Sequence, residues 1–370
     1  MVLFMIPYFI PNMPTTDQLI PYLREIDNNR WYSNFGPLYD KLSLRLSEEL
    51  LIGVNPYRIA IVSSGTSAIE LALKSLNLKP GANILTSGFT FPATIEAIIN
   101  AGLTPILCDV DKNSWQLTPE IAEHQISQQN IAAVLPVAAF GMPVCSESWA
   151  EFHLKTKLPV VVDAAAALLN QSIHDDLIYS FSLHATKTLG AGEGGIVVSP
   201  SKRQTIDIKK LSNFGIEPNR TISKSGYNAK MSEYHCAVGL AQLDRLNNIL
   251  DKRKEVFEYY LKKLRLTKLP ISYQAEIDKF IPSSFYVLFD TSSAEKVFNK
   301  LKISNIETRR LYYPLINKHK GFANILLSEG CQQKNSAYIA KKGLALPFHM
   351  HLTREEIDVV VIQLSELLLS

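Results

Sequence analysis

The sequence predicts an α/β protein in which a mostly parallel sheet lies between helices, followed by a smaller α+β domain. From about Arg58, short runs rich in β-branched residues alternate with helical patterns, as expected where crossover helices join parallel strands. These runs are strongly apolar, which is typical of strands buried on both faces. The pattern changes near Met231, where a long helical stretch begins.

The first part of the chain contains seven short runs that we expect to be strands. Between the first two runs, residues 66–76 are predicted to be helical because apolar residues such as Ile69 and Leu73 fall on one face. The expected strands are Arg58–Ser63, Asn83–Thr86, Thr104–Val110, Ala132–Val137, Pro159–Asp163, Ile178–Leu183 and Ile196–Ser199.

The second part is predicted to open with one long helix from Ser232 to about Leu264, because leucines recur there at helical spacing. A strand is expected at Phe285–Phe289. Thr353 and Glu356 form a capping box at the start of a final helix. We therefore expect a large α/β domain at residues 1–245 and a small α+β domain at residues 246–370. Residues 1–35 are expected to pack on the small domain.

Composition and charge argue against several classes of protein. Of the 370 residues, 46% are hydrophobic and 20% are charged, as in ordinary globular proteins and unlike disordered chains. The net charge is +3, and no Lys/Arg run is long enough to indicate a nucleic-acid partner.

The cysteines and the N-terminus indicate the cellular compartment in which the protein is expected. Cys108, Cys145, Cys236 and Cys331 are scattered and form no Cys-x-x-Cys pair, so we expect free thiols and no metal site. Residues 1–7 are apolar but lack a basic region and end in proline. We therefore expect neither a secretory signal nor a membrane span, and a cytoplasmic protein.

The most informative stretch is Phe181–Gly195, where a lysine follows the end of a predicted strand. Lys187 stands in a loop of small residues and glycines. Such neighbours would let the amine approach a flat ligand, and desolvation would lower its pKa. A lysine that reacts with an aldehyde needs that partly neutral state. Lys187 is therefore a candidate Schiff-base lysine, with a purely structural loop as the alternative.

Asp163 ends a buried strand, at the edge of a parallel sheet where ligands bind. Taken alone, an aspartate in this position is more often a turn or helix-capping residue. Beside a Schiff-base lysine, it could instead face the pyridine nitrogen of pyridoxal phosphate (PLP) and keep that nitrogen protonated.

Two strand-to-helix junctions complete the candidate site. Ser63–Ala68 places backbone N–H groups and hydroxyls at a helix N-terminus, which suits a phosphate, although a plain Ser/Thr cap is the alternative. Ser87–Pro92 offers two aromatic rings, Phe89 and Phe91, either of which could pack in the core or stack on a pyridine face.

In this order and spacing, the segments resemble the DegT/DnrJ/EryC1/StrS family of sugar aminotransferases, which are PLP-dependent transferases of fold type I. The similarity covers nearly the whole chain. It begins at Trp31–Leu38 and includes the Ser64–Ala68, Asp163–Ala165 and Lys187 segments. It continues through Gly226–Glu233 to Leu346–His349.

The resemblance implies a role for each of several residues. Lys187 would hold PLP as a Schiff base and Asp163 would pair with the pyridine nitrogen, as the catalytic residues. Phe91, rather than Phe89, would stack on the ring, and Asn228 would reach the phosphate from the neighbouring subunit of a homodimer with shared active sites. The cofactor-binding residues implied in this way are Gly65, Thr66, Ser67, Phe91, Asp163, Ser182, Lys187 and Asn228.

The sequence departs from the family pattern at two places. Ala166 stands where many members have glutamine or histidine near the phenolic oxygen of the cofactor. In Leu311–Pro314, tyrosines stand where members often have histidine. The residues that we expect to contact substrate in this region are Tyr313, Arg309 and His349.

The resemblance implies transfer of an amino group from L-glutamate to a nucleotide-linked keto-sugar, for amino-sugar or surface polysaccharide biosynthesis. A 4-keto-6-deoxyhexose linked to dTDP or UDP is the expected acceptor. A PLP-dependent sugar dehydratase is one alternative, although in that branch histidine replaces the lysine. A non-catalytic PLP-binding regulatory protein on the same fold is another, but it would be expected to lack Lys187 or to carry a DNA-binding module.

Overall fold

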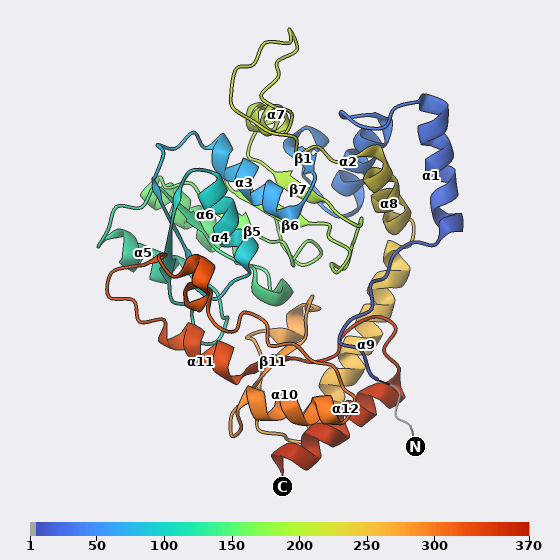
Figure 1. Ribbon diagram of the computed structural model, residues 1–370, viewed down its shortest axis with the longest axis vertical. Coiled ribbons are helices and arrows are strands. Elements are labelled where there is room, and N and C mark those ends of the chain that lie inside the picture. Colours follow the sequence, from blue (N-terminus) through green and yellow to red (C-terminus); the bar gives the residue numbers. More distant parts are fainter. Residues whose placement is uncertain (1–4, 370) are drawn as a thin grey trace.

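The computed structural model describes residues 5–369, which form a larger and a smaller part (Figure 1). The larger part contains the main sheet and the helices up to α8. The smaller part contains α10 to α12 and a short sheet, and α9 (Leu246–Leu266) runs from one part to the other along one side.

The main sheet is mostly parallel, as the sequence predicts. Its strands follow the orders β1-β7-β6-β5 and β10-β3-β2-β4, and bridges from Val134 to Val160 and from Val137 to Asp163 join the two groups through β4 and β5. Only β7 runs against its neighbours in the described part of this sheet. The strands are β1 (Ile59–Val62), β2 (Asn83–Ser87), β3 (Thr104–Cys108), β4 (Ala133–Leu135), β5 (Val161–Asp163), β6 (Ile178–Ser182), β7 (Gly195–Val198) and β10 (Leu326–Leu327).

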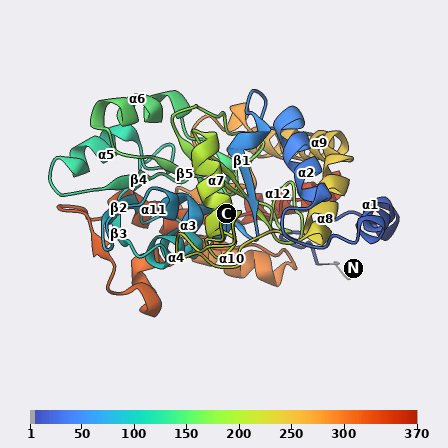
Figure 2. The ribbon, with the colours of Figure 1, turned by 90° about the horizontal axis from the view of Figure 1, so that it is seen from above.

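Successive residues of the strands face two different cores. In β1, Ile59 and Ile61 belong to one hydrophobic cluster, and Ala60 and Val62 belong to another. Figure 2 shows the sheet between helices on both sides, which explains why the predicted strands are apolar throughout. One face packs on α2 (Pro37–Glu49), α5 (Pro119–Ile126), α6 (Ser146–Thr156) and α8 (Glu233–Leu243), and the other on α3 (Gly65–Ser75), α4 (Pro92–Asn100) and α7 (Lys202–Leu211).

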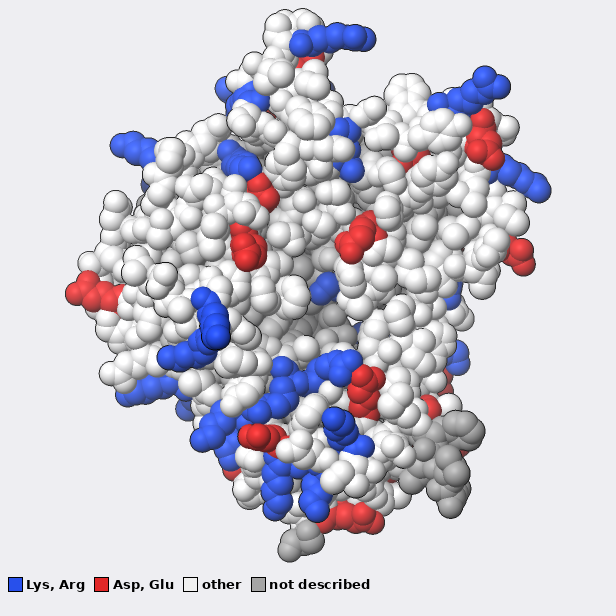
Figure 3. Space-filling model, viewed as in Figure 1, with Lys and Arg blue, Asp and Glu red and all other residues white. Residues whose placement is uncertain are grey.

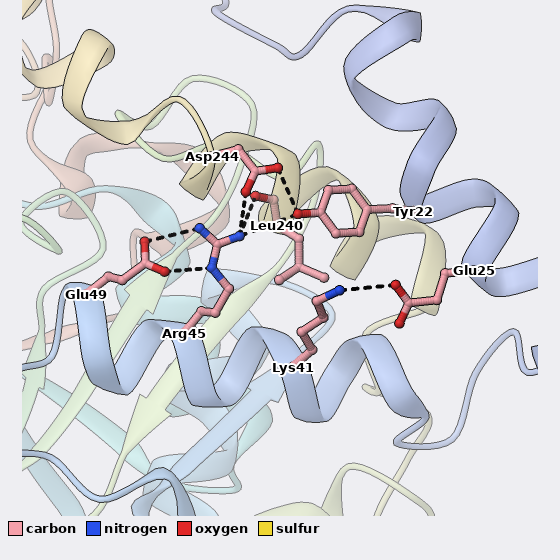
Figure 4. Close-up of polar contacts among 7 residues, drawn as sticks. All are labelled: Tyr22, Glu25, Lys41, Arg45, Glu49, Leu240 and Asp244. Atoms are coloured by element: carbon pink, nitrogen blue, oxygen red, sulfur yellow. Dashed lines mark hydrogen bonds and ion pairs between the residues drawn. The ribbon is translucent and has the colours of Figure 1, made fainter.

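The expectation of one continuous helix from Ser232 to Leu264 is wrong, because the chain breaks at Asp244 and Arg245. Arg245 leaves helical geometry, and its guanidinium donates to the carbonyl of Met13 (2.9 Å). Contacts to the N-terminal helices hold the end of α8. Figure 4 shows Asp244 accepting from Arg45 of α2 (2.6 Å) and from the hydroxyl of Tyr22 (2.7 Å). Leucine spacing alone did not reveal this break.

The smaller part contains an antiparallel sheet in the order β11-β9-β8, with its own hydrophobic core. The predicted strand within Phe285–Phe289 and the capping box of Thr353 and Glu356 are both present. Its elements are β8 (Ile271–Ser272), β9 (Tyr286–Phe289), α10 (Ala294–Ile303), α11 (Lys334–Lys342), β11 (Gly343–Ala345) and α12 (Arg354–Leu368). Short 3₁₀ turns lie at Pro56–Arg58, Ala139–Gly141, Ile277–Lys279, Ile316–Lys318 and Lys320–Phe322.

The N-terminal segment contacts both parts. Ile6 lies in the smaller core and bridges to Ile306, so the chain at residues 5–9 runs along the smaller part. The helix α1 (Thr16–Asn29) instead packs on α8, with Tyr22 and Ile26 in the core of the larger part. Residues 1–4 of the segment expected to pack on the small domain lie outside the described residues.

Two further sequence expectations concern thiols and membranes. Each of the four cysteines is a free thiol, as expected. Among the helices of residues 5–369, none is long and apolar enough to cross a bilayer. The apolar N-terminal run on which we based the absence of a secretory signal lies partly in residues 1–4, outside the described chain.

Candidate active site

A cavity of about 900 Å³ lies where β5 and β6 end, between the larger and smaller parts. Asp163 ends β5, Ser182 ends β6 and Gly65 begins α3, while Ser284 and Arg309 line the side that belongs to the smaller part. Figure 3 shows a hollow in the middle of this face, with Lys or Arg atoms deep inside it. The carboxyl ends of parallel strands meet at one edge of the sheet, so residues distant in sequence converge here.

Lys187 lines the cavity from the loop that follows β6. The loop is closed by backbone hydrogen bonds, including Lys187 N–H to the carbonyl of His184 (2.8 Å). It is tightly folded, since a Cβ at Gly190 would come within 3.0 Å of the Ala185 backbone. Burial lowers the pKa of the Lys187 amine, and the charge of Asp163 partly opposes that shift. A larger share of the amine is therefore neutral and able to attack a carbonyl.

Asp163 presents a buried carboxylate to the same cavity. One oxygen accepts from the hydroxyl of Thr94 (2.7 Å) and the other from the backbone N–H of Ala165 (3.1 Å). Burial raises the pKa of this carboxyl, while these two hydrogen bonds and Lys187 act to lower it. A carboxylate has about four acceptor positions, so Asp163 can accept a further hydrogen bond from a ligand.

The start of α3 forms the corner of the cavity that suits a phosphate. Ser64 caps the helix by accepting from the N–H of Ser67 (3.1 Å), and Gly65 and Thr66 line the cavity. A Cβ at Gly65 would lie 2.7 Å from the Cβ of Ser182, so glycine is required for the helix to approach β6 this closely. Backbone N–H groups at a helix N-terminus favour an anion.

Ser67 lies behind this corner. Its hydroxyl lies 3.0 Å from that of Ser64 and 3.3 Å from that of Ser63, and it is not among the residues that line the cavity. In this geometry, Ser67 can orient the other hydroxyls.

The two rings of the Ser87–Pro92 segment have different surroundings. Phe91 lines the cavity with 61% of its surface exposed, just before α4. Phe89 is completely buried and packs edge-on against Phe140 and Tyr312. Of the two, therefore, Phe91 is the ring that a ligand in the cavity can reach.

Asn228 lies on the surface and does not line the cavity of its own chain. Its side-chain oxygen accepts from Lys230 (2.8 Å), and its backbone pairs with Asn213. An exposed asparagine in this position can serve a ligand only outside its own chain's cavity.

The three expected substrate residues are not brought together. Arg309 lines the cavity, where it pairs with Glu307 (2.5 Å). Tyr313 lies outside the cavity, with the guanidinium of Arg310 3.4 Å from its ring centroid. His349 is 2% exposed and buried away from the cavity, and burial lowers its pKa.

Three residues that the sequence analysis did not select lie at the site. Thr94 binds Asp163, and Tyr8 and Tyr312 line the cavity, with Tyr312 stacked on Phe140 (4.8 Å between centroids). Tyr312 lies in the segment that was expected to contact substrate, but the local pattern does not distinguish it from Tyr313. Tyr8 is far along the chain from every motif, and no local signal marks it.

Comparison with known proteins identifies the chain. The sequence model of the DegT/DnrJ/EryC1/StrS aminotransferase family matches residues 15–365. The chain belongs to this family. It is therefore a PLP-dependent aminotransferase, as the sequence resemblance predicted.

Individual members of the family align over the whole chain. The dTDP-4-amino-4,6-dideoxy-D-glucose transaminase of Shigella dysenteriae is 32% identical, covering 98% of this chain and 99% of its own. The GDP-perosamine synthase of Escherichia coli O157:H7 is 26% identical, covering 98% of each chain. A solved structure from Bacillus cereus ATCC 10987, assigned as a PLP-dependent aminotransferase, is 28% identical. It covers 97% of this chain and 99% of its own with a TM-score of 0.89, in agreement with the predicted fold type.

The residues of the cavity fit this cofactor. Any side chain at residue 65 would occupy the space beside Ser182, so glycine keeps this corner of the cavity open. The N–H groups at the start of α3 are available there to a phosphate. Asp163 retains acceptor capacity for a pyridine N–H, and Lys187 can reach into the same cavity. When bound, PLP supplies an aldehyde carbon and a ring that withdraws electrons from the carbon losing a proton.

Proposed function

We propose that this enzyme transfers the amino group of L-glutamate to a nucleotide-linked keto-sugar, for amino-sugar or surface polysaccharide biosynthesis. A 4-keto-6-deoxyhexose linked to dTDP or UDP is the proposed acceptor. The observation that carries the proposal is whole-length identity of 32% to a dTDP-amino-sugar transaminase, together with Lys187 and Asp163 in one cavity. We also propose that it acts in the cytoplasm.

We propose a part in the reaction for each of these residues. Lys187 is the proposed covalent anchor for the cofactor. Its amine, whose pKa is lowered by burial, is also proposed to accept and return the proton of the reacting carbon when it is not bound to the cofactor. Asp163 is proposed to hold a proton on the pyridine nitrogen. Gly65, Thr66 and Ser182 are proposed to bind the phosphate, and Phe91 to stack on the ring.

Charge at the cavity mouth supports an anionic acceptor. Arg309 lines the cavity, and Lys and Arg side chains gather below the hollow, over the smaller part (Figure 3). A diphosphate requires cationic or backbone donors. Tyr8 is a further candidate for contact with the sugar. Its hydroxyl donates to the hydroxyl of Ser284 (3.2 Å), and its backbone N–H donates to the carboxylate of Glu307 (3.0 Å).

The acceptor class can be tested by direct assay. dTDP- and UDP-linked 4-keto-6-deoxyhexoses, the corresponding 3-keto sugars and free keto acids are each offered with L-glutamate. We expect turnover of a nucleotide-linked 4-keto sugar at a kcat/KM within the ordinary enzyme range of about 10⁴–10⁸ M⁻¹ s⁻¹. Efficient use of free keto acids with no turnover of any nucleotide sugar would refute the sugar assignment and leave the aminotransferase chemistry standing.

We further propose that two chains form a homodimer whose active sites are shared. Asn228 is exposed and lies outside its own cavity, as expected of a residue that serves the neighbouring site. Nearby Phe214 and Ile222 expose apolar surface (46% and 70%), which favours a protein contact at this face.

Subunit mixing tests that arrangement. Lys187→Ala and Asn228→Ala chains, each inactive or strongly impaired alone, should regain activity when mixed, because one site of the heterodimer contains both wild-type residues. At equal mixing, half of the dimers are mixed and half of their sites are intact, so recovery approaches about one quarter of wild-type activity. The mixed dimer is first verified by two different affinity tags. Absence of recovery in a verified heterodimer would show that Asn228 does not act across subunits.

A further inference from the structure

A second, smaller cavity of about 230 Å³ adjoins the first. Both cavities are lined by Ala165, Ala166, Ser182 and Lys187, so the two spaces share one wall. The small cavity continues to the N-terminal half of α9, where Arg253 lines it. The short side chain of Ala166 takes up little of the space between them.

Among the described residues, no carboxylate pairs with Arg253, which is a buried cation. It is 6% exposed, its guanidinium lies over the ring of Phe348 (4.7 Å), and it donates one hydrogen bond, to the carbonyl of Pro282 (2.6 Å). Within residues 5–369, this is its single hydrogen bond and it forms no ion pair. Burial lowers the pKa of Arg253 to about 10, so it still carries its charge at neutral pH.

This arrangement is costly unless an anion completes it. A buried charge is normally paired, and a guanidinium offers five N–H donors in a planar fork that matches a carboxylate. The other charged groups on the cavity are Lys187, Lys254 and Asp251. Asp251 and Lys254 are exposed on α9, where water screens their charges, whereas Arg253 and Lys187 lie deeper.

We propose that the small cavity binds a carboxylate of the amino donor and that Arg253 is its counter-charge. This rests on the proposed function, in which the donor is an amino acid. Lys187 and Arg253 line the same small space, so a donor whose carboxylate meets Arg253 has its amino group near Lys187. The space is about a quarter of the main cavity and suits an amino acid rather than a nucleotide sugar.

Binding of glutarate, a dicarboxylate without an amino group, measures this site directly. Isothermal titration of the PLP-loaded enzyme with glutarate should give a dissociation constant at least about 10-fold higher in Arg253→Met than in wild type, because a charge-assisted hydrogen bond is lost. The half-reaction with L-glutamate, followed by absorbance, should need a similarly higher glutamate concentration for half-saturation. The reverse half-reaction with the nucleotide-linked amino sugar should change less than about 2-fold.

Two further variants distinguish a loss of glutarate binding from a folding defect. Leu250→Phe fills the cavity and leaves the charge in place, and it should also weaken glutarate binding. Lys252→Met is the matched control, since it also removes a cation from α9. Lys252 pairs with Glu255 (3.3 Å) and does not line the cavity. Its glutarate affinity should equal that of wild type.

The outcomes separate this inference from the proposed function. The inference is overturned if glutarate binds Arg253→Met and Leu250→Phe as tightly as it binds wild type. It is also overturned if Arg253→Met slows the two half-reactions equally, because an equal loss indicates a structural role for Arg253. If wild type uses no nucleotide sugar, the acceptor assignment fails, and the glutarate titration still decides the role of Arg253.

Discussion

Replacing Lys187 with alanine is expected to abolish transamination and to leave the fold intact. The side chain lies on a cavity wall, in a loop held by backbone hydrogen bonds that alanine preserves. Loss of a positioned proton-transfer group alone costs roughly 10²–10⁴-fold in rate, and loss of the covalent anchor adds to that. PLP should still bind, but without the visible absorbance of a lysine-linked cofactor. Steady-state kinetics and an absorbance spectrum measure both effects.

Two companion variants define the cause of that loss. Lys187→Arg keeps the charge but removes the nucleophilic amine, so it should be as inactive as Lys187→Ala. Lys112→Ala, at an exposed position outside the cavity, should behave as wild type. If Lys187→Ala kept the lysine-linked absorbance together with normal turnover, another residue would have to be the anchor.

Replacing Asp163 with asparagine is expected to slow turnover strongly while PLP remains bound. Asparagine has nearly the same shape: its oxygen can accept from Ala165, and its NH₂ can donate to Thr94, whose hydroxyl can turn toward Thr90 (2.7 Å). The packing is therefore kept, and the charge that holds a proton on the pyridine nitrogen is lost. We expect a barrier higher by about 2–4 kcal/mol, on the order of 10²-fold in kcat.

Thr94→Val is the matched control for that variant. It removes the hydrogen bond to Asp163 and leaves the carboxylate, so its effect on kcat should be much smaller than that of Asp163→Asn. Fluorescence titration with PLP shows whether each variant retains the cofactor. Near-wild-type kcat for PLP-saturated Asp163→Asn would mean that the aspartate has only a structural role.

Much of the fold and part of the candidate site were predictable because their signals are local. Apolar runs of four to seven residues mark the strands, and all seven predicted runs coincide with strands of the main sheet. Lys187 could be recognised because it stands among small residues and glycines. Asp163 could be recognised because it is a carboxylate at the end of a buried strand. The junction that contains Gly65 could be recognised because a predicted strand leads there directly into a predicted helix.

Other features depend on contacts between distant segments. The break between α8 and α9 follows from the hydrogen bonds of Asp244 and Arg245 to the N-terminal segment, which helical periodicity does not encode. Tyr8 reaches the cavity because residues 5–9 run along the smaller part. Neighbouring aromatics look alike in sequence, so only the packed structure places Tyr312 on the cavity wall and Tyr313 outside it.

By itself, the sequence determined the α/β class, seven strands of the main sheet and the two catalytic candidates, because each rests on residues close together in the chain. The order of such local motifs along the chain also determined the family. The tertiary structure alone decided that Tyr312 and not Tyr313 lines the cavity, that Thr94 binds Asp163, and that Arg253 is buried without a counter-charge in the described chain. The physical reason is that burial and partner choice are properties of the packed chain: the same arginine on a helix is a solvated surface charge or an enclosed cation depending on what packs against it.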